Sequence, residues 1–361
     1  MSFLIFVKNS PMPLFKKLVI KEIKRETKDS VSILFNVPEE FKSHYTFIAG
    51  QYVNLRLTLD GQEIRRAYSI CADPESGELR IAVKAVKNGK FSQFANTKLK
   101  VGDVLEVGKP EGKFTFEPHA DRQKNYAAFV AGSGITPVIS ILKSVLKSES
   151  QSSFVLVYGN KSPEETIFYQ ELHDLQSKYT GRLFVHYVYS QAKADGVLFG
   201  RIDKSAVNFV LNNKHKELEF DKFYLCGPEE MINTVSKVLK EHNIKDAAIK
   251  FELFSTSTTE NKIDKALEGH TKITIMVDDE KTTFEMSQKQ TILEAALKQG
   301  VDAPYSCQGG ICSSCLARVK SGTAVMKKNS ILTDSEIAEG LVLTCQAHPT
   351  SETIVVDYDD V

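Results

Sequence analysis

Apolar and polar residues alternate in short runs over residues 16–116, and turn residues separate these runs. Such alternation is typical of strands that bury one face against a core. The runs that fit are 18–23, 31–37, 52–59, 67–71, 79–86 and 104–107. Asp60-Gly61 and Asn88-Gly89 have the composition of turns. The pattern predicts an antiparallel β-barrel with one helix, over residues 92–99.

Beyond Tyr126 the pattern changes to buried apolar runs that alternate with amphipathic segments. The expected strands are 127–131, 154–158, 183–189, 222–226 and 249–254, and the expected helices are 136–146, 163–178, 204–211 and 228–241. Strands and helices in strict alternation indicate an α/β domain with a doubly wound parallel sheet.

The C-terminal part combines strands and a helix without this alternation. A polar stretch without periodicity, residues 255–270, predicts a linker. After it come an expected hairpin (272–277 and 282–286), a helix (291–299), a cysteine-rich loop and strands 316–320 and 353–356. We therefore expect a multi-domain chain with units at 12–119, 120–254 and 271–361.

Composition places this chain among ordinary globular proteins. Its 361 residues exceed the roughly 250 to 300 at which a single core stops growing, so several domains are expected. Lys plus Arg and Asp plus Glu number 46 each, which leaves no net field to attract nucleic acid. No segment approaches the roughly 20 apolar residues of a membrane span. We expect a cytoplasmic enzyme that binds neither nucleic acid nor membranes.

Four of the six cysteines lie within the last 55 residues, as Cys307, Cys312, Cys315 and Cys345. The spacing C-x4-C-x2-C with a distant fourth cysteine is that of a plant-type 2Fe-2S cluster. Structural zinc is the main alternative, but it usually uses two CxxC pairs, and one such pair is present here. Disulfides are the other alternative, and a cytosol disfavours them. The spacing therefore predicts an iron-sulfur cluster.

A second motif, Arg66-Ala67-Tyr68-Ser69, lies in the predicted barrel. A guanidinium can bind a flavin phosphate, an aromatic ring can cover the flavin, and a hydroxyl can bond its reactive edge. Alone, the motif fits equally an ordinary strand with a surface arginine. It is followed by Gly89-Lys90-Phe91-Ser92 at the start of the predicted helix, where free amides favour a pyrophosphate.

Two further motifs end strands of the predicted parallel sheet, where open sheets place ligands. They are Gly132-Ser133-Gly134-Ile135-Thr136-Pro137 and Cys226-Gly227-Pro228-Glu229. Thr136 is equally suited to cap a helix, and buried free cysteines such as Cys226 and Cys71 are commonly core residues. We expect Cys71 to be core, whereas the resemblance described next implies that Cys226 contacts the nicotinamide.

In these motifs and their order, residues 16–254 resemble the ferredoxin-NADP reductase family, and the last 90 residues resemble plant-type ferredoxins. The resemblance implies FAD in the barrel, NADPH or NADH on the doubly wound domain, and an α+β, β-grasp ferredoxin domain holding the cluster through Cys307, Cys312, Cys315 and Cys345. It implies catalytic roles for Tyr68, Ser69, Thr136 and Cys226. The implied cofactor-binding residues are Arg66, Tyr68, Ser69, Val83, Lys84, Gly89, Phe91, Ser92, Gly132, Gly134, Thr136, Pro137, Asn160, Lys161, Ser190, Cys226, Gly227 and Pro228.

NADPH is favoured over NADH because Lys161 and Ser162 follow one strand end and Ser190 follows the next, where a 2′-phosphate could meet them. No acidic residue stands at either strand end, although Glu164 and Glu165 are close in sequence. Lys161 is equally suited to be a solvated surface residue.

The domain order resembles that of oxygenase reductase subunits. It implies electron transfer from NAD(P)H through flavin and cluster to a partner oxygenase, with phenylacetyl-CoA epoxidation as the leading expectation. Reductases of aromatic-ring or steroid hydroxylases share the order and remain alternatives, as does a non-catalytic iron-sulfur redox sensor. A self-contained oxygenase is disfavoured, since the chain has no pair of Glu-x-x-His segments for a di-iron site.

Overall fold

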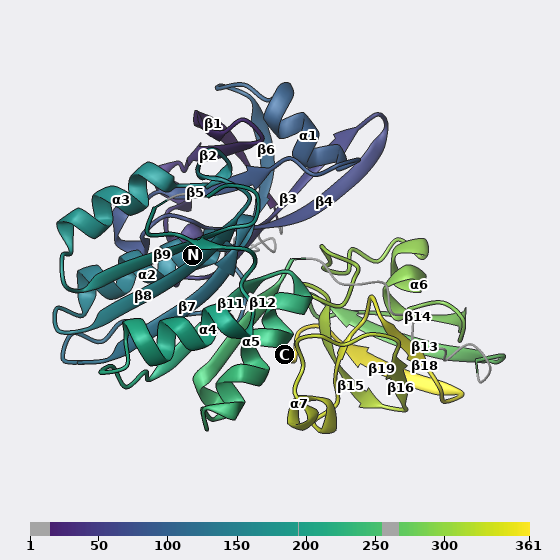
Figure 1. The fold of residues 1–361 in the computed structure, drawn as a ribbon. Coiled ribbons are helices and arrows are strands. Elements are labelled where there is room, and N and C mark those ends of the chain that lie inside the picture. Colours follow the sequence, from purple (N-terminus) through teal and green to yellow (C-terminus); the bar gives the residue numbers. More distant parts are fainter. Residues whose placement is uncertain (1–14, 194, 255–266) are drawn as a thin grey trace, which may run out of the picture.

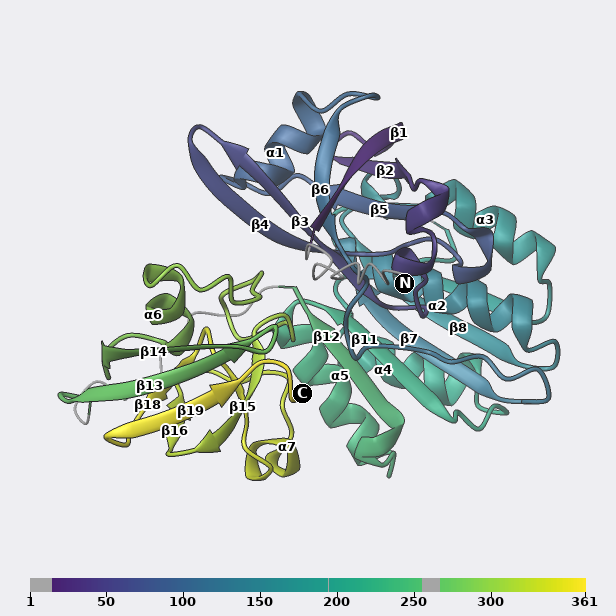
Figure 2. The same cartoon turned by 180° about the vertical axis from the view of Figure 1, so that it is seen from behind.

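The computed structural model describes residues 15–193, 195–254 and 267–361. They form three units that meet around a common centre (Figures 1 and 2). The predicted multi-domain architecture, with an antiparallel barrel, a doubly wound α/β domain and a third α+β unit, is confirmed. Among the described residues, no helix is long and apolar enough to cross a membrane.

The first unit is an antiparallel barrel in which the strand order is β4-β3-β6-β1-β2-β5. An isolated bridge between Ile70 and Ile81 joins its two ends. Asp60 and Gly61 both have positive φ, which suits the tight turn of the β3–β4 hairpin. The elements are β1 (Phe15–Thr27), β2 (Ser30–Asn36), β3 (Tyr52–Leu59), β4 (Gln62–Ser69), β5 (Leu79–Lys84), α1 (Lys90–Thr97) and β6 (Val104–Gly108).

The second unit is a parallel sheet of order β10-β9-β8-β7-β11-β12. Helices α2 and α3 pack on one face, and α4 and α5 pack on the other. The order reverses between β7 and β11, which makes their carboxyl ends the expected ligand site. The elements are β7 (Asn125–Ala131), α2 (Ile135–Ser148), β8 (Ser153–Asn160), α3 (Tyr169–Lys178), β9 (Leu183–Tyr189), β10 (Leu198–Phe199), α4 (Lys204–Phe209), β11 (Lys222–Gly227), α5 (Glu229–Glu241) and β12 (Ile249–Leu253).

One expected helix of this unit, residues 163–178, is wrong in its first turns. Residues 163–165 form a separate 3-10 turn, and α3 begins only at Tyr169. Phe168 between them has φ of 61°, a left-handed conformation that an α-helix cannot contain. Its side chain is nevertheless buried against the sheet, so tertiary packing fixes this break.

The third unit has a five-stranded sheet of order β14-β13-β19-β15-β17 and a small β16–β18 pair. Its elements are β13 (His270–Val277), β14 (Glu280–Ser287), α6 (Ile292–Lys298), β15 (Leu316–Ser321), β16 (Ala324–Met326), α7 (Asp334–Ala338), β17 (Leu341–Leu343), β18 (Ala347–Pro349) and β19 (Thr353–Asp357). Most of the expected linker, residues 255–266, lies outside the described residues. Leu267 is already buried, and β13 begins within the range expected to be linker.

Candidate active site

A cavity of about 680 Å³ opens where the three units meet. The barrel contributes β4, the end of β5 and the start of α1, the parallel sheet contributes the ends of β7 and β12, and the third unit contributes its cysteine loop. The predicted residues that line it are Arg66, Tyr68, Ser69, Lys84, Gly89, Phe91, Ser92, Thr136, Cys307 and Cys312. The structure thus brings the flavin motifs and two cluster cysteines into one space.

The barrel side of this cavity fits a flavin with its phosphates. The rings of Tyr68 and Phe91 pack with centroids 5.3 Å apart and provide an aromatic wall. Gly89 caps α1, and a Cβ there would lie 2.3 Å from the Ser92 hydroxyl, so the close turn requires glycine. The first amides of α1 are therefore open to a pyrophosphate. Arg66 lies in the same wall, within reach of such a phosphate.

A half-buried carboxyl group, Glu252, lines the cavity, and the sequence analysis missed it. The Ser69 hydroxyl donates to it across 3.5 Å. Burial raises the pKa of Glu252 to about 8, and the hydrogen bond from Ser69 lowers it by less. The sequence did offer one signal for Glu252, because it is a single acidic residue near the carboxyl end of the predicted strand, β12 (Ile249–Leu253). Ser69, Thr136 and Glu252 thus place polar groups in the wall of the flavin cavity.

A second cavity, of about 440 Å³, lies over the carboxyl ends of β7, β8 and β9. The predicted residues that line it are Lys84, Gly132, Asn160, Lys161, Ser190 and Pro228. The amide of Asn160 has its polar atoms buried without a hydrogen-bond partner among the described residues, as in a site built for a polar ligand. Lys84 lines both cavities, so the two sites are adjacent.

Arg201 also lines the second cavity, and the sequence analysis missed it. Lys161, which was predicted, forms an ion pair with Glu165 at 3.3 Å. The cavity also contains the acidic residues Asp203 and Glu230. The only sequence signal for Arg201 was its place after the two-residue strand β10, which carries too little periodicity to be recognised.

The remaining predicted residues of this region line neither cavity: Val83, Gly134, Pro137, Cys226 and Gly227. These five residues lie behind the side chains that line the two cavities. A Cβ at Gly134 would lie 2.2 Å from the Cys226 carbonyl oxygen, so the loop after β7 touches the end of β11. Cys226 is fully buried, and burial followed by the charge of Glu252 raises the pKa of its thiol well above its usual value. Its predicted contact with the nicotinamide stays a prediction.

The four predicted cluster ligands come together around the loop that precedes β15. Side-chain hydrogen bonds among the four thiols lower the pKa of Cys307 and Cys315 and raise that of Cys312 and Cys345, so the four side chains lie within hydrogen-bonding distance of one another. The Gly309 amide donates to the Cys307 Sγ across 3.3 Å. An amide directed at sulfur suits a thiolate ligand.

No group of His, Cys, Asp or Glu that could hold a metal ion is found among the described residues. The fit of the cysteines to a cluster therefore rests on their spacing, their mutual proximity and the Gly309 amide at the Cys307 sulfur, rather than on a formed coordination shell.

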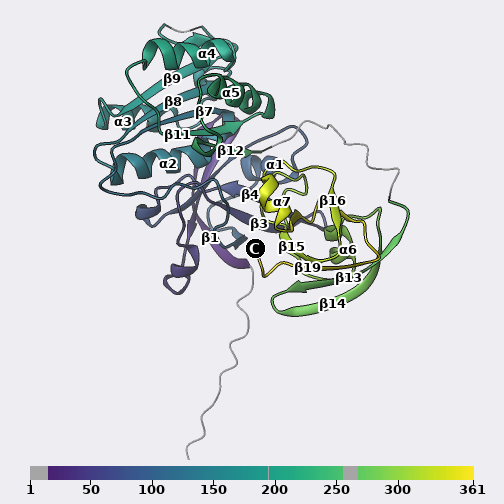
Figure 3. The same ribbon diagram turned by 90° about the horizontal axis from the view of Figure 1, so that it is seen from below.

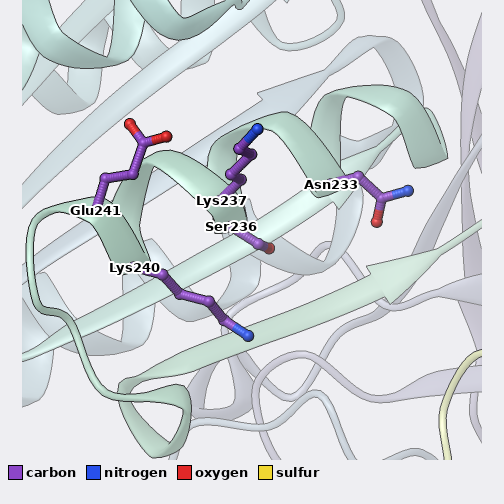
Figure 4. A pocket seen from close by; sticks show the side chains of 5 residues that line it. All are labelled: Asn233, Ser236, Lys237, Lys240 and Glu241. Carbon is purple, nitrogen blue, oxygen red and sulfur yellow. The ribbon is translucent and has the colours of Figure 1, made fainter.

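A third hollow, of about 540 Å³, is a shallow one on the outer side of α5. Figure 4 shows its side chains projecting from the helix, and none belongs to a predicted motif. Its lining residues are Asn233, Ser236, Lys237, Lys240 and Glu241. It plays no part in the two adjoining cavities.

Family models match each unit in turn. An oxidoreductase FAD-binding domain matches residues 17–116, an oxidoreductase NAD-binding domain matches residues 129–237, and a 2Fe-2S iron-sulfur cluster binding domain matches residues 275–350. The chain thus contains, in this order, the three cofactor-binding domains expected from its motifs.

Similar proteins share the whole arrangement. The chain is 38% identical over 360 residues to a subunit of the 1,2-phenylacetyl-CoA epoxidase of Escherichia coli (strain K12), covering 96% of this chain and 99% of the relative. It is 30% identical over 352 residues to the ferredoxin reductase component of 3-ketosteroid-9-alpha-monooxygenase of Rhodococcus rhodochrous, covering 94% and 96%. Phthalate dioxygenase reductase has the same fold, with a TM-score of 0.58 over 95% of this chain and 98% of that one, at 24% identity. The chain therefore belongs to the family of NAD(P)H-dependent reductases, with FAD-binding, NAD-binding and 2Fe-2S domains, that transfer electrons to oxygenases.

Proposed function

We propose that this reductase takes electrons from NADPH and delivers them to an oxygenase that epoxidises phenylacetyl-CoA. The reductase chemistry is carried by one observation: Cys307 and Cys312 line the same cavity as Tyr68 and Ser69. When bound, FAD accepts hydride from the nicotinamide and releases single electrons, and a 2Fe-2S cluster carries them one at a time. No further protein or mobile carrier is then needed between flavin and cluster.

Each wall residue has a proposed binding role. Arg66 and the α1 amides beside Gly89 would hold the FAD phosphates and Tyr68 would cover the ring system. Ser69 would donate to the reactive edge of the flavin in place of its long bond to Glu252. Thr136, whose hydroxyl donates to the Ser133 carbonyl across 3.0 Å, shapes the passage between the sites. Cys307, Cys312, Cys315 and Cys345 ligate the cluster.

Preference for NADPH is proposed from the cationic side of the second cavity. Lys161 and Arg201 lie there with the Ser190 hydroxyl, and a 2′-phosphate accepts from such groups. The competing influence is Glu165, which already pairs with Lys161. Arg201 therefore carries more of this proposal than Lys161 does.

Steady-state kinetics with both nucleotides test the cofactor proposal. We expect the native protein to prefer NADPH, and Arg201→Ala to raise KM for NADPH by about tenfold, which matches about 1.4 kcal/mol for a charge-assisted bond. KM for NADH should change little, and Lys161→Ala should have a smaller effect. A native preference for NADH would contradict the proposal.

The acceptor proposal rests on the 38% identity to an epoxidase subunit over nearly the full length of both chains. The cytoplasm, where thiols stay reduced, suits the four free cysteines of the cluster loop. The test is to recover the oxygenase that copurifies from native cells and to measure phenylacetyl-CoA consumption with NADPH. A 3-ketosteroid substrate is the matched control. Oxidation of the steroid alone would favour the alternative suggested by the second relative.

A further inference from the structure

Arg65 precedes the proposed flavin-phosphate residue Arg66, yet it points elsewhere, since neighbouring side chains on a strand face opposite ways. Arg66 lines the flavin cavity and Arg65 does not. The Arg65 guanidinium is 5% exposed, and its Nε donates to Glu63 Oε1 across 2.8 Å. Its Nη2 donates to Asp302 Oδ1 across 2.9 Å. One buried cation of the barrel thus binds the ferredoxin unit.

The same guanidinium also holds a ring of the ferredoxin unit. Its Cζ lies 4.5 Å from the centroid of Tyr305, and the Tyr305 hydroxyl donates to Glu63 across 3.4 Å. A cation over an aromatic face is attractive, more so when it is shielded from water. Asp302 and Tyr305 lie five and two positions before Cys307, so Arg65 holds the segment that leads into the cysteine loop.

A second set of contacts fixes the other end of that loop. The Tyr52 hydroxyl lies 2.9 Å from the Ser314 Oγ and 3.2 Å from the Ser313 Oγ. Asn54 Nδ2 donates to the Ser314 Oγ across 3.1 Å. Tyr52 is itself held by a reciprocal backbone pair with Glu111, with both bonds at 2.8 Å. Ser313 and Ser314 lie between Cys312 and Cys315, two proposed cluster ligands.

Figure 3 shows the ferredoxin unit lying against the β3 and β4 side of the barrel, the two strands that carry these contacts. Between the two anchors, Cys307 and Cys312 face the flavin cavity. We propose that Arg65 and Tyr52 are positioning residues that clamp both ends of segment 302–315 against the barrel, and thereby set the geometry for electron transfer from flavin to cluster. This step is internal to the chain and does not depend on which oxygenase accepts the electrons.

The test removes each anchor at a residue that does not line the flavin cavity, because Arg65 and Ser314 are absent from its lining, whereas their partners Glu63 and Tyr52 belong to it. Arg65→Gln removes the buried cation, and Ser314→Ala removes the hydroxyl that meets both Tyr52 and Asn54. Arg65→Lys is the conservative variant, which keeps the charge but cannot fork between Glu63 and Asp302. Lys113→Gln is the matched control, because it breaks an exposed ion pair of 2.6 Å between the same two units.

Two rates are measured by anaerobic stopped flow: reduction of the flavin by NADPH and reduction of the cluster by the flavin. Hydrogen–deuterium exchange of residues 302–315 and the electron paramagnetic resonance spectrum of the reduced cluster are recorded alongside. In Arg65→Gln and Ser314→Ala we expect flavin reduction within about twofold of native, cluster reduction slower by about tenfold, and faster exchange in the loop, because small displacements of reacting groups cost rate steeply. Arg65→Lys should be intermediate and Lys113→Gln native.

Cluster reduction at the native rate in both anchor variants would overturn the proposal. Loss of cluster signal and iron in parallel with rate would also overturn it, because the anchors would then be structural only. If Arg65→Gln does not fold, Asp302→Asn replaces it, since this side chain is 64% exposed and its loss leaves no buried charge on the ferredoxin side. Failure of the oxygenase assay leaves these outcomes unaffected.

Discussion

At the scale of single residues, Glu252 shows how burial controls a proton. Its folded-state pKa of about 8 exceeds the ordinary 4.5, so the native protein binds this proton more tightly than the unfolded chain does. Stability attributable to Glu252 is therefore full below about pH 4.5 and is lost as the pH rises to about 8. The raised pKa favours the protonated, neutral form of this carboxyl group in the wall of the flavin cavity.

This predicts that Glu252→Gln, which mimics the protonated acid, flattens the pH dependence of stability. We expect thermal unfolding midpoints of the flavin-loaded variant to fall less than native midpoints between about pH 6 and 8. Glu111, whose pKa burial raises to about 7, contributes equally in both proteins and cancels in the comparison. Parallel curves for the two proteins would show that Glu252 does not hold its proton.

The residues that sequence analysis missed share one property: their roles depend on neighbours far along the chain. Arg65 is a charged residue beside a motif until Asp302, 237 positions later, reaches it. Glu252 is an acid in a strand until Ser69 and the barrel cover it. The cluster cysteines, by contrast, are recognisable from their spacing in the sequence, and this spacing was enough to predict the cluster.

At the scale of elements, sequence periodicity works where an element is long enough to show it. Strand 183–189 has the predicted bounds, and the expected hairpin at 272–286 is present. The three-residue strands β16, β17 and β18 were missed because so few residues show no period. Helix α7 was missed although Thr333 and Glu336 form a capping box, a local signal that was available.

The contact between the β7–α2 loop and the end of β11 gives a prediction at this scale. Gly134→Ala would place a Cβ 2.2 Å from the Cys226 carbonyl, and backbone cannot yield as a side chain can. We expect a loss of about 1 to 3 kcal/mol in the free energy of unfolding and a higher KM for NADPH. Gly108→Ala is the matched control, since the nearest atom to its Cβ would lie 3.5 Å away. Equal effects in urea unfolding would contradict the steric account.

At the scale of the whole molecule, the zero net charge is the sum of an acidic C-terminal part and a basic remainder. Residues 268–361 contain 14 Asp and Glu but only 8 Lys and Arg, so the rest of the chain is correspondingly basic. The ion pairs Arg65–Asp302 and Lys113–Glu336 join the basic part to the acidic part. The sequence analysis considered only the net charge of the whole chain, so it did not detect that the domains carry opposite charges.

The flavin cavity and the four cysteines predict which cofactors the purified protein contains. Purified protein should be yellow-brown and carry one flavin, two irons and labile sulfide per chain, because one barrel cavity and one set of four cysteines are present in the described residues. Metal and sulfide analysis with flavin release measures this. Stoichiometric zinc without iron would restore the structural-zinc alternative.

Cys345→Ser should separate the two halves of the electron path. The barrel and the parallel sheet have hydrophobic cores distinct from that of the ferredoxin unit, which contains Cys345, so the flavin site should survive loss of the cluster. Reduction of flavin by NADPH should therefore continue near the native rate, while reduction of one-electron acceptors through the cluster should fall at least about tenfold, because serine is a poor replacement for a thiolate ligand.

Cys71→Ser is the matched control: Cys71 is buried in the core next to α2, where its Sγ donates to the Arg80 carbonyl, and it is remote in sequence from the cluster loop. Native delivery of electrons by Cys345→Ser to the partner oxygenase would show that the path does not run through the cluster.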